Sequence, residues 1–519
     1  MIHPLDEKKC SADQAVALVT DGQTVATSGL IGAAVPEALL IALERRFQRD
    51  QKPQQLTLIY GAGQGDGDQR GVNHLAHEGL LRRVIGGHWG LAPKLGRLAN
   101  EGKIEAYNFP QGVICQLYRD IAAGRPGCIT HVGLDTFIDP LHQGGRLNDQ
   151  TPDEGLVRRI QLEDTTWLWY KALPIHVGLI RADQADRFGN LSMAGEVLIG
   201  EVLPIAQAAH NHGGVVIAQV RETVDGALPP HHVHVPGILV DRVVVAGPSE
   251  HEQTFGEINS AFCDPQPDNF VVPPRTSQPI SLDARRIISV RACDELCAGA
   301  ICNLGIGMPE GVARIAAERG LLEKVTLTVE SGPIGGMPAG GLAFGASVHP
   351  QAIIDQPAMF DFYDGQGLDF AALGAAQIDS RGNVNVSRFA NRLAGVGGFV
   401  NITQNAKHLV FCGTFTANGL QVTVQDGQLK IVQEGTQTKL VDQVEQVSFS
   451  AQRALSRGQR VLYVTERAVF RLTDRGLELI ETAPGIDVNQ DVLARMDFEP
   501  VMRAVGSMPS HAFEPNSKI

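Results

Sequence analysis

A single carboxylate stands at the end of a predicted buried strand in the second half of the chain. The apolar run 325–329 ends at Glu330, and the segment that follows, SGPIGGMPAGG, is rich in glycine. In open α/β sheets, ligands bind at the carboxyl ends of the parallel strands. Glycine-rich backbone there can approach a ligand and direct N–H groups at developing negative charge. The pattern makes Glu330 a candidate catalytic group, although a carboxylate at a strand end often forms only a turn contact.

A second candidate site is the turn 303–310, NLGIGMPE, which joins a predicted strand to the N-terminus of a predicted helix. Exposed N–H groups at such a terminus suit a phosphate, a carboxylate or a thioester oxygen. The turn is not the dinucleotide fingerprint GxGxxG, because Glu310 takes the place of the third glycine. In the segment 61–67, GAGQGDG, Asp66 breaks the same pattern. A tight turn without a ligand is the alternative interpretation.

Histidine and cysteine do not predict a metal site. His231, His232 and His234 follow two prolines and lead into an apolar run, which favours the start of a strand over a ligand set. The eight cysteines are scattered without a CxxC pair, so we expect reduced, mostly buried thiols. The serine nucleophile motif GxSxG is also absent, which weakens a serine hydrolase.

The elements that must position these residues occur twice. Residues 21–46 contain an apolar strand, a glycine-rich turn and the start of a helix, and the apolar strand 56–60 follows. Residues 298–320 and 325–329 repeat this order. Strands that are apolar almost throughout, alternating with helices, predict parallel sheets covered by helices. We therefore expect an α/β fold made of two duplicated, open parallel-sheet domains with helices on both faces.

The repeat also predicts the domain boundary. The segment 262–279 contains five prolines and little apolar periodicity, which is typical of a linker. This places the first domain at residues 1–275 and the second at 276–519. In this alignment of the two copies, Glu330 of the second matches Gly61 of the first.

Composition excludes several classes of function. The 519 residues include 44 Lys and Arg against 57 Asp and Glu, a formal net charge of −13. Nucleic acids and anionic membranes select basic surfaces, so neither is an expected partner. There is no uncharged apolar stretch long enough to span a membrane, and the first ten residues have no apolar signal-peptide core. We expect a cytoplasmic protein.

Long segments of the chain resemble the class I CoA-transferases, specifically the fused acyl-CoA:acetate/3-ketoacid and propionate CoA-transferases. In the second half these segments are VESGPIGGMPAGGLAFGASV, AIIDQPAMFDFYDGQGLD and GVGGFVNITQNAKHLVFCGTFTANGL. In the first half they are DGQTVATSGLIGAAVPE, FPQGVICQLYRDIAAGRPG and THVGLDTFIDP. The match covers nearly the full length, and the wider family's Ser-Glu-Asn-Gly motif here reads Val-Glu-Ser-Gly.

The resemblance implies a short-chain acyl-CoA:carboxylate CoA-transferase with a ping-pong mechanism. Glu330 would be the nucleophile, forming first an acyl-glutamyl anhydride and then a glutamyl-CoA thioester. The resemblance also implies oxyanion contacts from the side chains of Gln111 and Asn303 and from the backbone N–H groups of Gly398 and Gly419. The implied CoA-contact loop comprises Gly305, Ile306, Gly307, Met308 and Pro309.

The same resemblance implies the partners. These are acyl-CoA and short-chain carboxylates, with CoA as a substrate moiety and no permanently bound cofactor, in a homodimer or homotetramer. For Gln111 and Asn303 a simple turn hydrogen bond is the alternative. Two other functions remain open: an acyl-CoA hydrolase on the same fold, and a non-catalytic acyl-CoA-binding protein. The identity of the acyl chain is also open.

Overall fold

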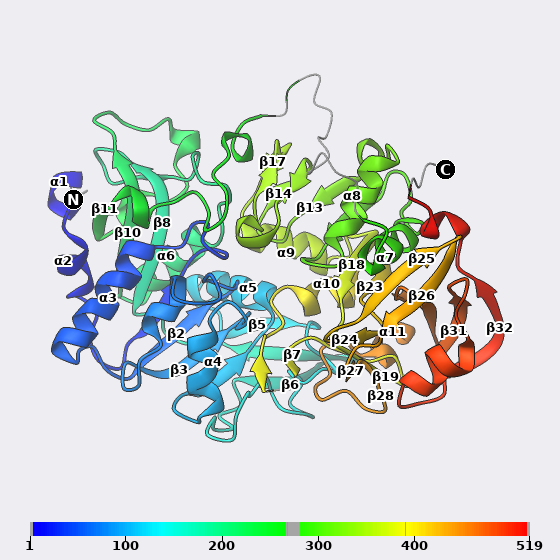
Figure 1. The fold of residues 1–519 in the computed structure, drawn as a ribbon. Coiled ribbons are helices and arrows are strands. Elements are labelled where there is room, and N and C mark those ends of the chain that lie inside the picture. Colours follow the sequence, from blue (N-terminus) through cyan, green and yellow to red (C-terminus); the bar gives the residue numbers. More distant parts are fainter. Residues whose placement is uncertain (1–3, 266, 268–280, 390, 516–519) are drawn as a thin grey trace.

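The structure is a computed structural model that describes residues 4–265, 267, 281–389 and 391–515. The predicted boundary at residue 275 and most of the predicted linker lie outside the described residues. Two large sheets lie side by side, the first from residues 24–245 and the second from residues 301–507 (Figure 1).

The first sheet is almost entirely parallel. Its strand order is β11-β10-β8-β1-β2-β3-β4, and only the short β9 pairs antiparallel, with β8. The strands are β1 (Thr24–Thr27), β2 (Leu56–Tyr60), β3 (Leu81–Gly86), β4 (Glu105–Asn108), β8 (Val177–Ala185), β9 (Leu191–Ser192), β10 (Val215–Thr223) and β11 (Arg242–Val245). A separate three-stranded sheet contains β5 (Gly127–Thr130), β6 (Val157–Leu162) and β7 (Thr165–Lys171).

Helices cover this sheet in two groups. α2 packs on α3, and α5 packs on α6, which contacts β8 and β10. The helices are α1 (Leu5–Lys8), α2 (Ala12–Val16), α3 (Glu37–Asp50), α4 (Pro93–Asn100), α5 (Gln111–Ala122) and α6 (Val202–Asn211). In α3, Leu39, Leu40, Leu43 and Phe47 are buried, the spacing of one helical face turned to a core.

The second sheet has a parallel centre with antiparallel additions. Its order is β17-β14-β13-β12-β18-β23-β29-β30-β31-β32, with β13, β12, β18, β23 and β29 parallel. These strands are β12 (Ile301–Leu304), β13 (Thr326–Thr328), β14 (Pro333–Ile334), β17 (Ala352–Ile353), β18 (Phe370–Gly374), β23 (His408–Cys412), β29 (Arg460–Val464), β30 (Ala468–Thr473), β31 (Gly476–Thr482) and β32 (Val501–Ser507).

The α/β fold with parallel sheets is confirmed, and the antiparallel additions have a simple cause. Only residues 465–467 join β29 to β30, and only residues 474–475 join β30 to β31. A parallel pair needs a crossover of a dozen or more residues, whereas a hairpin needs about two. These short connections therefore force antiparallel pairing of β30 with β29 and β31, whereas the outermost strand β32 pairs parallel with β31.

Helices of the second half also form two groups. α7 packs on α8, while α9 packs on α10 and also contacts α5 of the first half. The helices are α7 (Ala284–Cys293), α8 (Glu310–Glu318), α9 (Gln356–Asp364), α10 (Phe399–Asn405) and α11 (Ala451–Ser456). The α5–α9 contact brings the two halves together near the middle of Figure 1.

The predicted repeat is visible in the strand pairing. β1 is connected through α3 to its parallel neighbour β2, and β12 is connected through α8 to its parallel neighbour β13. In both sheets the first of these strands has a further parallel neighbour on its other side, β8 or β18. The turns after β2 and β13 consequently occupy corresponding places in the two halves.

Candidate active site

Glu330 lies in a tight turn two residues beyond β13. The backbone N–H of Gly332 donates to the carbonyl of Val329 over 2.9 Å and closes the turn. Gly332 has φ of 127°, and a Cβ there would lie 2.0 Å from the carbonyl oxygen of Ile354. Only glycine fits such a position. This close packing holds the turn and therefore the backbone that carries the Glu330 carboxyl group.

Burial dominates the electrostatics of Glu330. It raises the pKa of the carboxyl group, and hydrogen bonds from its own backbone N–H and from the Asn303 side chain partly offset this effect. The Asn303 amide nitrogen lies 3.5 Å from Oε2 of Glu330. The same amide donates to the hydroxyl of Tyr363 over 3.3 Å. Because the side chain is half-buried, its carboxylate has lost part of its hydration, and less water has to be removed before it attacks.

Glu330 faces a cavity of about 170 Å³ between the two halves of the chain. From the first half the lining residues are Leu30, Ile31, Gly63, His88, Leu91 and Gln111. From the second half they are Asn303, Gly305, Ile306, Glu330, Phe344, Leu373, Val396, Gly397, Gly398, Phe399 and Ile402. The residues that line the cavity are mainly apolar, and Glu330 is the carboxylate among them.

The structure gathers most of the predicted site residues around this cavity. Gln111, Asn303, Gly305, Ile306 and Gly398 line it together with Glu330. Gly307, Met308 and Pro309 continue the same loop but do not line this cavity.

Gly419 lies elsewhere. It is exposed in the connection between β24 (Thr416–Ala417) and β25 (Gln421–Gln425), and its carbonyl accepts a hydrogen bond from Gln433 over 2.9 Å. The arrangement therefore does not support an oxyanion contact from Gly419.

Gln111 is held by the opposite half of the chain. It is the first residue of α5, and its backbone N–H donates to the carbonyl of Gly397 over 2.9 Å. Gly397 in turn donates to the carbonyl of Gly87 over 2.7 Å. The side-chain nitrogen of Gln111 is buried and has no hydrogen-bond partner among the described residues. A buried amide donor without a protein partner is suited to bind an oxygen of a ligand.

Leu304 and Glu310, which flank the loop 305–309, line a second and larger cavity. The second cavity has about 560 Å³ and includes Arg285, Glu310, Arg314 and Phe344 in its lining. Phe344 also lines the smaller cavity, so the two adjoin. The Arg285 guanidinium donates to the carbonyl of Gly307 over 3.0 Å and so holds the loop 305–309.

Comparison with known proteins agrees with this geometry. A family profile described as Coenzyme A transferase matches residues 9–246. Acetate CoA-transferase YdiF of Escherichia coli is 41% identical over 95% of this chain and 92% of its own length. Caffeate CoA-transferase of Acetobacterium woodii is 42% identical over 96% of this chain and 95% of its own.

A solved structure extends the match to three dimensions. The YdiF acyl-CoA transferase of Escherichia coli O157:H7, solved as a thioester complex with CoA, superposes with a TM-score of 0.92. It is 38% identical and covers 100% of this chain and 99% of its own. The chain belongs to the class I CoA-transferases. The predicted enzyme class, CoA transfer between an acyl-CoA and a carboxylate, is thereby confirmed.

Sequence analysis missed His88 in the wall of this CoA-transferase's cavity. His88 follows β3, where the sequence reads GGHWG. A histidine flanked by glycines just beyond the carboxyl end of a parallel strand was a usable signal, because ligands bind at that edge. The apolar lining residues, such as Phe344, carried no comparable signal.

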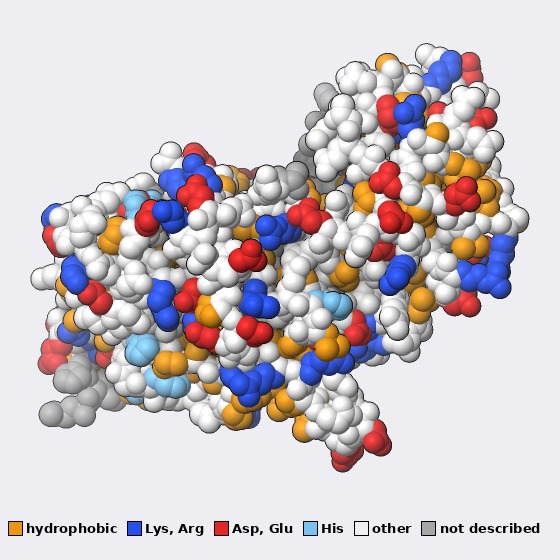
Figure 2. All heavy atoms as spheres, turned by 90° about the horizontal axis from the view of Figure 1, so that it is seen from below, with side chains coloured by type: hydrophobic (Ala, Val, Ile, Leu, Met, Phe, Trp, Pro, Cys, Tyr) orange, Lys and Arg blue, Asp and Glu red, His pale blue; other side chains and the backbone are white. Residues whose placement is uncertain are grey.

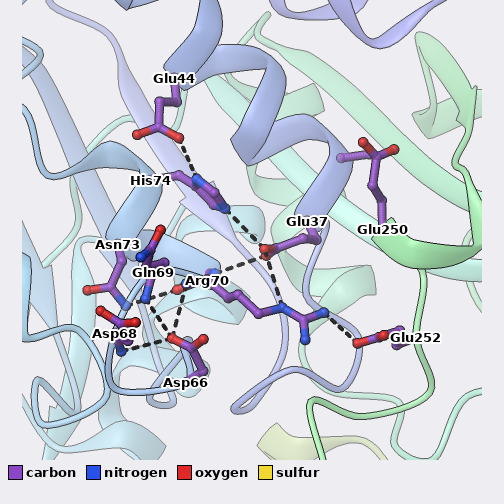
Figure 3. A network of polar contacts seen from close by, with 12 residues as sticks. Glu37, Glu44, Asp66, Asp68, Gln69, Arg70, Asn73, His74, Glu250 and Glu252 are labelled. Atoms are coloured by element: carbon purple, nitrogen blue, oxygen red, sulfur yellow. Dashed lines mark hydrogen bonds and ion pairs between the residues drawn. The ribbon is translucent and has the colours of Figure 1, made fainter.

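A network of polar side chains lies at the start of α3 (Figure 3). It adjoins the loop that carries Leu30 and Ile31, two residues of the cavity wall. The buried Glu37 follows this loop and accepts from the backbone N–H of Gly71 over 2.9 Å. His74 lies between two carboxylates, with Nε2 3.1 Å from Glu37 and Nδ1 2.5 Å from Glu44.

This network also reaches a third segment of the transferase. Arg70 lies 3.8 Å from Glu37 and forms a 2.6 Å ion pair with Glu252 (Figure 3). The Arg70 guanidinium stacks 3.7 Å from the centre of the Phe255 ring. Gly32 of the cavity loop touches this ring so closely that a Cβ there would lie 2.2 Å from it. The loop is therefore held by charged and aromatic side chains that do not line the cavity.

The network predicts a pH-dependent contribution to stability. Burial by itself lowers the pKa of His74, but the hydrogen bonds and charges of Glu37 and Glu44 outweigh it and raise the pKa above 6.5. A raised pKa in the folded state stabilises the fold at low pH, and this contribution disappears as pH rises through that pKa. His74→Gln should therefore lower the Tm at pH 6 and have a much smaller effect at pH 9.

Thermal denaturation of wild type and variant across this pH range measures the effect. Hydrogen bonds to charged groups contribute about 1.5–3 kcal/mol each. The exposed His210 provides the matched control. The Tm of His210→Gln should stay close to that of the wild type at every pH. A Tm loss in His74→Gln that grows toward pH 9 would contradict the charged state of His74.

The described part of the chain lacks two features. No helix there is long and apolar enough to cross a bilayer. No group of three or more His, Cys, Asp or Glu side chains in that part could hold a metal ion. On the face shown in Figure 2, basic and acidic side chains are interspersed rather than gathered into a field of one sign.

Proposed function

We propose that this enzyme transfers CoA by a ping-pong reaction in which Glu330 carries first the acyl group and then CoA. The observation that carries the proposal is the position of Glu330, the carboxylate in a small and mainly apolar cavity between the two halves. A carboxyl group is required because only an acid forms both an anhydride and a thioester. The relative solved as a thioester complex with CoA supports such an intermediate on this chain.

The reaction needs no external acid or base. A Glu330 carboxylate oxygen attacks the thioester carbonyl, the C–S bond breaks, and CoA leaves as a thiolate. The thiolate attacks the glutamyl carbonyl of the resulting anhydride and releases the first carboxylate. The acceptor carboxylate then reverses these two steps on the glutamyl-CoA thioester. Each bond formed matches a bond broken, and water takes no part.

Donors at the cavity wall support the oxyanions of these steps. The unpartnered amide of Gln111, the amide of Asn303 and the backbone N–H of Gly398 all belong to residues that line the cavity with Glu330. Such preorganised donors act in a water-poor site, where each contributes about 3–4 kcal/mol to transition-state stabilisation. The apolar wall keeps water from the anhydride, which would otherwise hydrolyse.

The larger cavity is suited to the rest of CoA. Arg285 and Arg314 line it, and guanidinium groups bind phosphate well. We place the pantetheine arm past Phe344, the residue shared by the two cavities, with the loop Gly305–Pro309 beside it. Binding energy from this distant part of the substrate can lower the barrier at the thioester.

Trapping of the thioester tests the proposal. The protein is incubated with acetyl-CoA in the absence of an acceptor, and intact and peptide mass spectrometry should show a CoA adduct on the peptide that contains Glu330. Free CoA is the control, because it lacks the thioester energy and should leave no adduct. The absence of an adduct after acetyl-CoA treatment would refute the mechanism.

The same incubation separates the alternative functions. Release of CoA that does not depend on added acetate would identify an acyl-CoA hydrolase. Binding of acetyl-CoA with neither adduct nor turnover would identify a non-catalytic binding protein. The proposed transferase instead requires acetate or another carboxylate for continued turnover.

We also propose a cytoplasmic location, a division into two domains and a homo-oligomeric assembly. All eight cysteines are unpaired, which supports a reducing, cytoplasmic compartment. Each half contains its own large sheet, which supports the division into domains 1–275 and 276–519. We also propose a homodimer or homotetramer, as the family resemblance implies.

A further inference from the structure

We propose that His88 is a specificity-determining residue that hydrogen-bonds a polar substituent on the acyl chain. The substrates it favours are short monocarboxylic acyl groups that carry a hydroxyl or oxo group. This inference rests on the proposed function, because it assigns the acyl group to the cavity that contains Glu330.

The ring of His88 is fixed in a slot formed by glycines. A Cβ on Gly63 would lie 2.7 Å from Nδ1, and a Cβ on Gly90 would lie 3.0 Å from Cε1. A Cβ on Gly397 would lie 3.7 Å from the ring carbon Cδ2. Glycines from both halves of the chain thus allow the imidazole to lie flat against backbone. A side chain held in this way presents its free edge to a ligand in one orientation.

The hydrogen-bonding capacity of His88 is unused by the protein. Nδ1 is buried and has no partner, and no hydrogen bond of Nε2 is found within the described residues. Gly63, whose Cβ would lie beside Nδ1, lines the cavity, whereas Gly90, whose Cβ would lie 3.4 Å from Nε2, does not. We therefore assign the ring proton to Nδ1, the buried nitrogen without a partner. Buried donors without a partner are rare in proteins, and a ligand oxygen would satisfy this one.

The charge of His88 limits which substituent it can take. Burial, with a smaller contribution from Arg392, lowers its pKa to about 4. The imidazole is therefore neutral near pH 7, and no Lys or Arg is among the lining residues of this cavity. A second carboxylate on the acyl group would be buried without a counter-ion, which is strongly unfavourable. A neutral oxygen acceptor suits the Nδ1–H group of His88 without this penalty.

The other polar side chains of the lining already have roles at the reacting carbonyl. Glu330 is the proposed nucleophile, and Gln111 and Asn303 are proposed oxyanion donors. The remaining side chains of the cavity wall are apolar. His88 is thus the polar side chain left for the body of the acyl group. The volume of the cavity, about 170 Å³, suits a short chain.

Matched acceptor pairs test this inference. With acetyl-CoA as donor, kcat/KM is measured for propionate against 2-hydroxypropionate, and for butyrate against 3-hydroxybutyrate and 3-oxobutyrate. In the wild type, at least one substituted acid should exceed its unsubstituted partner about tenfold or more, because a site built to bond an oxygen rejects the analogue without it. Succinate should be used at least tenfold less well than butyrate.

Two variants of similar size isolate the hydrogen bond. His88→Met removes the donor and should lower kcat/KM for the favoured substituted acid at least tenfold more than for its unsubstituted partner. His88→Gln keeps an N–H donor and should restore part of the preference. Equal losses for substituted and unsubstituted acids in His88→Met would overturn the specificity role.

One readout separates this inference from the mechanism on which it rests. The CoA adduct on Glu330 is measured in the wild type and in both His88 variants after treatment with acetyl-CoA. If the wild type forms no adduct, the proposed function fails. If all three proteins form it and the wild type shows no preference within either pair, the role of His88 fails and the ping-pong mechanism stands.

Discussion

Glu330→Gln should reduce kcat for CoA transfer by at least about 10⁴-fold, the scale of loss when a covalent nucleophile is removed. The amide has nearly the shape of the carboxyl group, so the cavity and its apolar wall should persist. It cannot form the anhydride or the thioester, so the CoA adduct should also disappear. Steady-state transfer from acetyl-CoA to a second carboxylate, together with intact mass spectrometry, measures both effects.

Glu201 offers a matched control for this substitution. Glu201 is fully buried, whereas Glu330 is half-buried, and burial raises the pKa of Glu201 to about 8. It does not line the cavity. Because Glu201 is mostly protonated at pH 7, a neutral amide is a close replacement. Glu201→Gln should therefore keep kcat within about threefold and still form the adduct. Full activity of Glu330→Gln, or a CoA adduct that persists in this variant, would contradict the proposed mechanism.

Gln111→Met should lower kcat by about 10²–10³-fold, the usual effect of removing one oxyanion donor. The oxyanion exists only near the transition state, so the KM for acyl-CoA should change little. The variant should still form the CoA adduct, but more slowly, which rapid-quench mass spectrometry can follow. This combination distinguishes an oxyanion donor from a group that merely binds the ground state.

Gln116 provides the control from the same helix. It lies on α5 outside the cavity lining and donates to Asp364 of the second half over 3.0 Å. Gln116→Met should alter kcat by less than about threefold, because its amide bonds a protein carboxylate and not the substrate. A Gln111→Met variant with normal kcat and a raised KM would assign Gln111 to substrate binding instead.

Much of the fold follows from local pattern. The repeated order of apolar strand, glycine turn and helix correctly predicted the paired units β1-α3-β2 and β12-α8-β13. It also placed Glu330 just beyond a parallel strand of the second sheet, β13. The antiparallel edge of the second sheet was not predicted, although its two- and three-residue connections are visible in the sequence once the strands are known.

The sequence by itself determined the α/β class, the duplicated unit and the nucleophile candidate, since each depends on residues close together in the chain. Only the tertiary structure decided which distant residues share a cavity. The contact of α5 with α9 and α10 brings Gln111 and His88 of the first half to Glu330, while Gly419 stays on an exposed connection. Periodicity reports which face of an element is buried, but the partner of that face is chosen by packing across hundreds of residues.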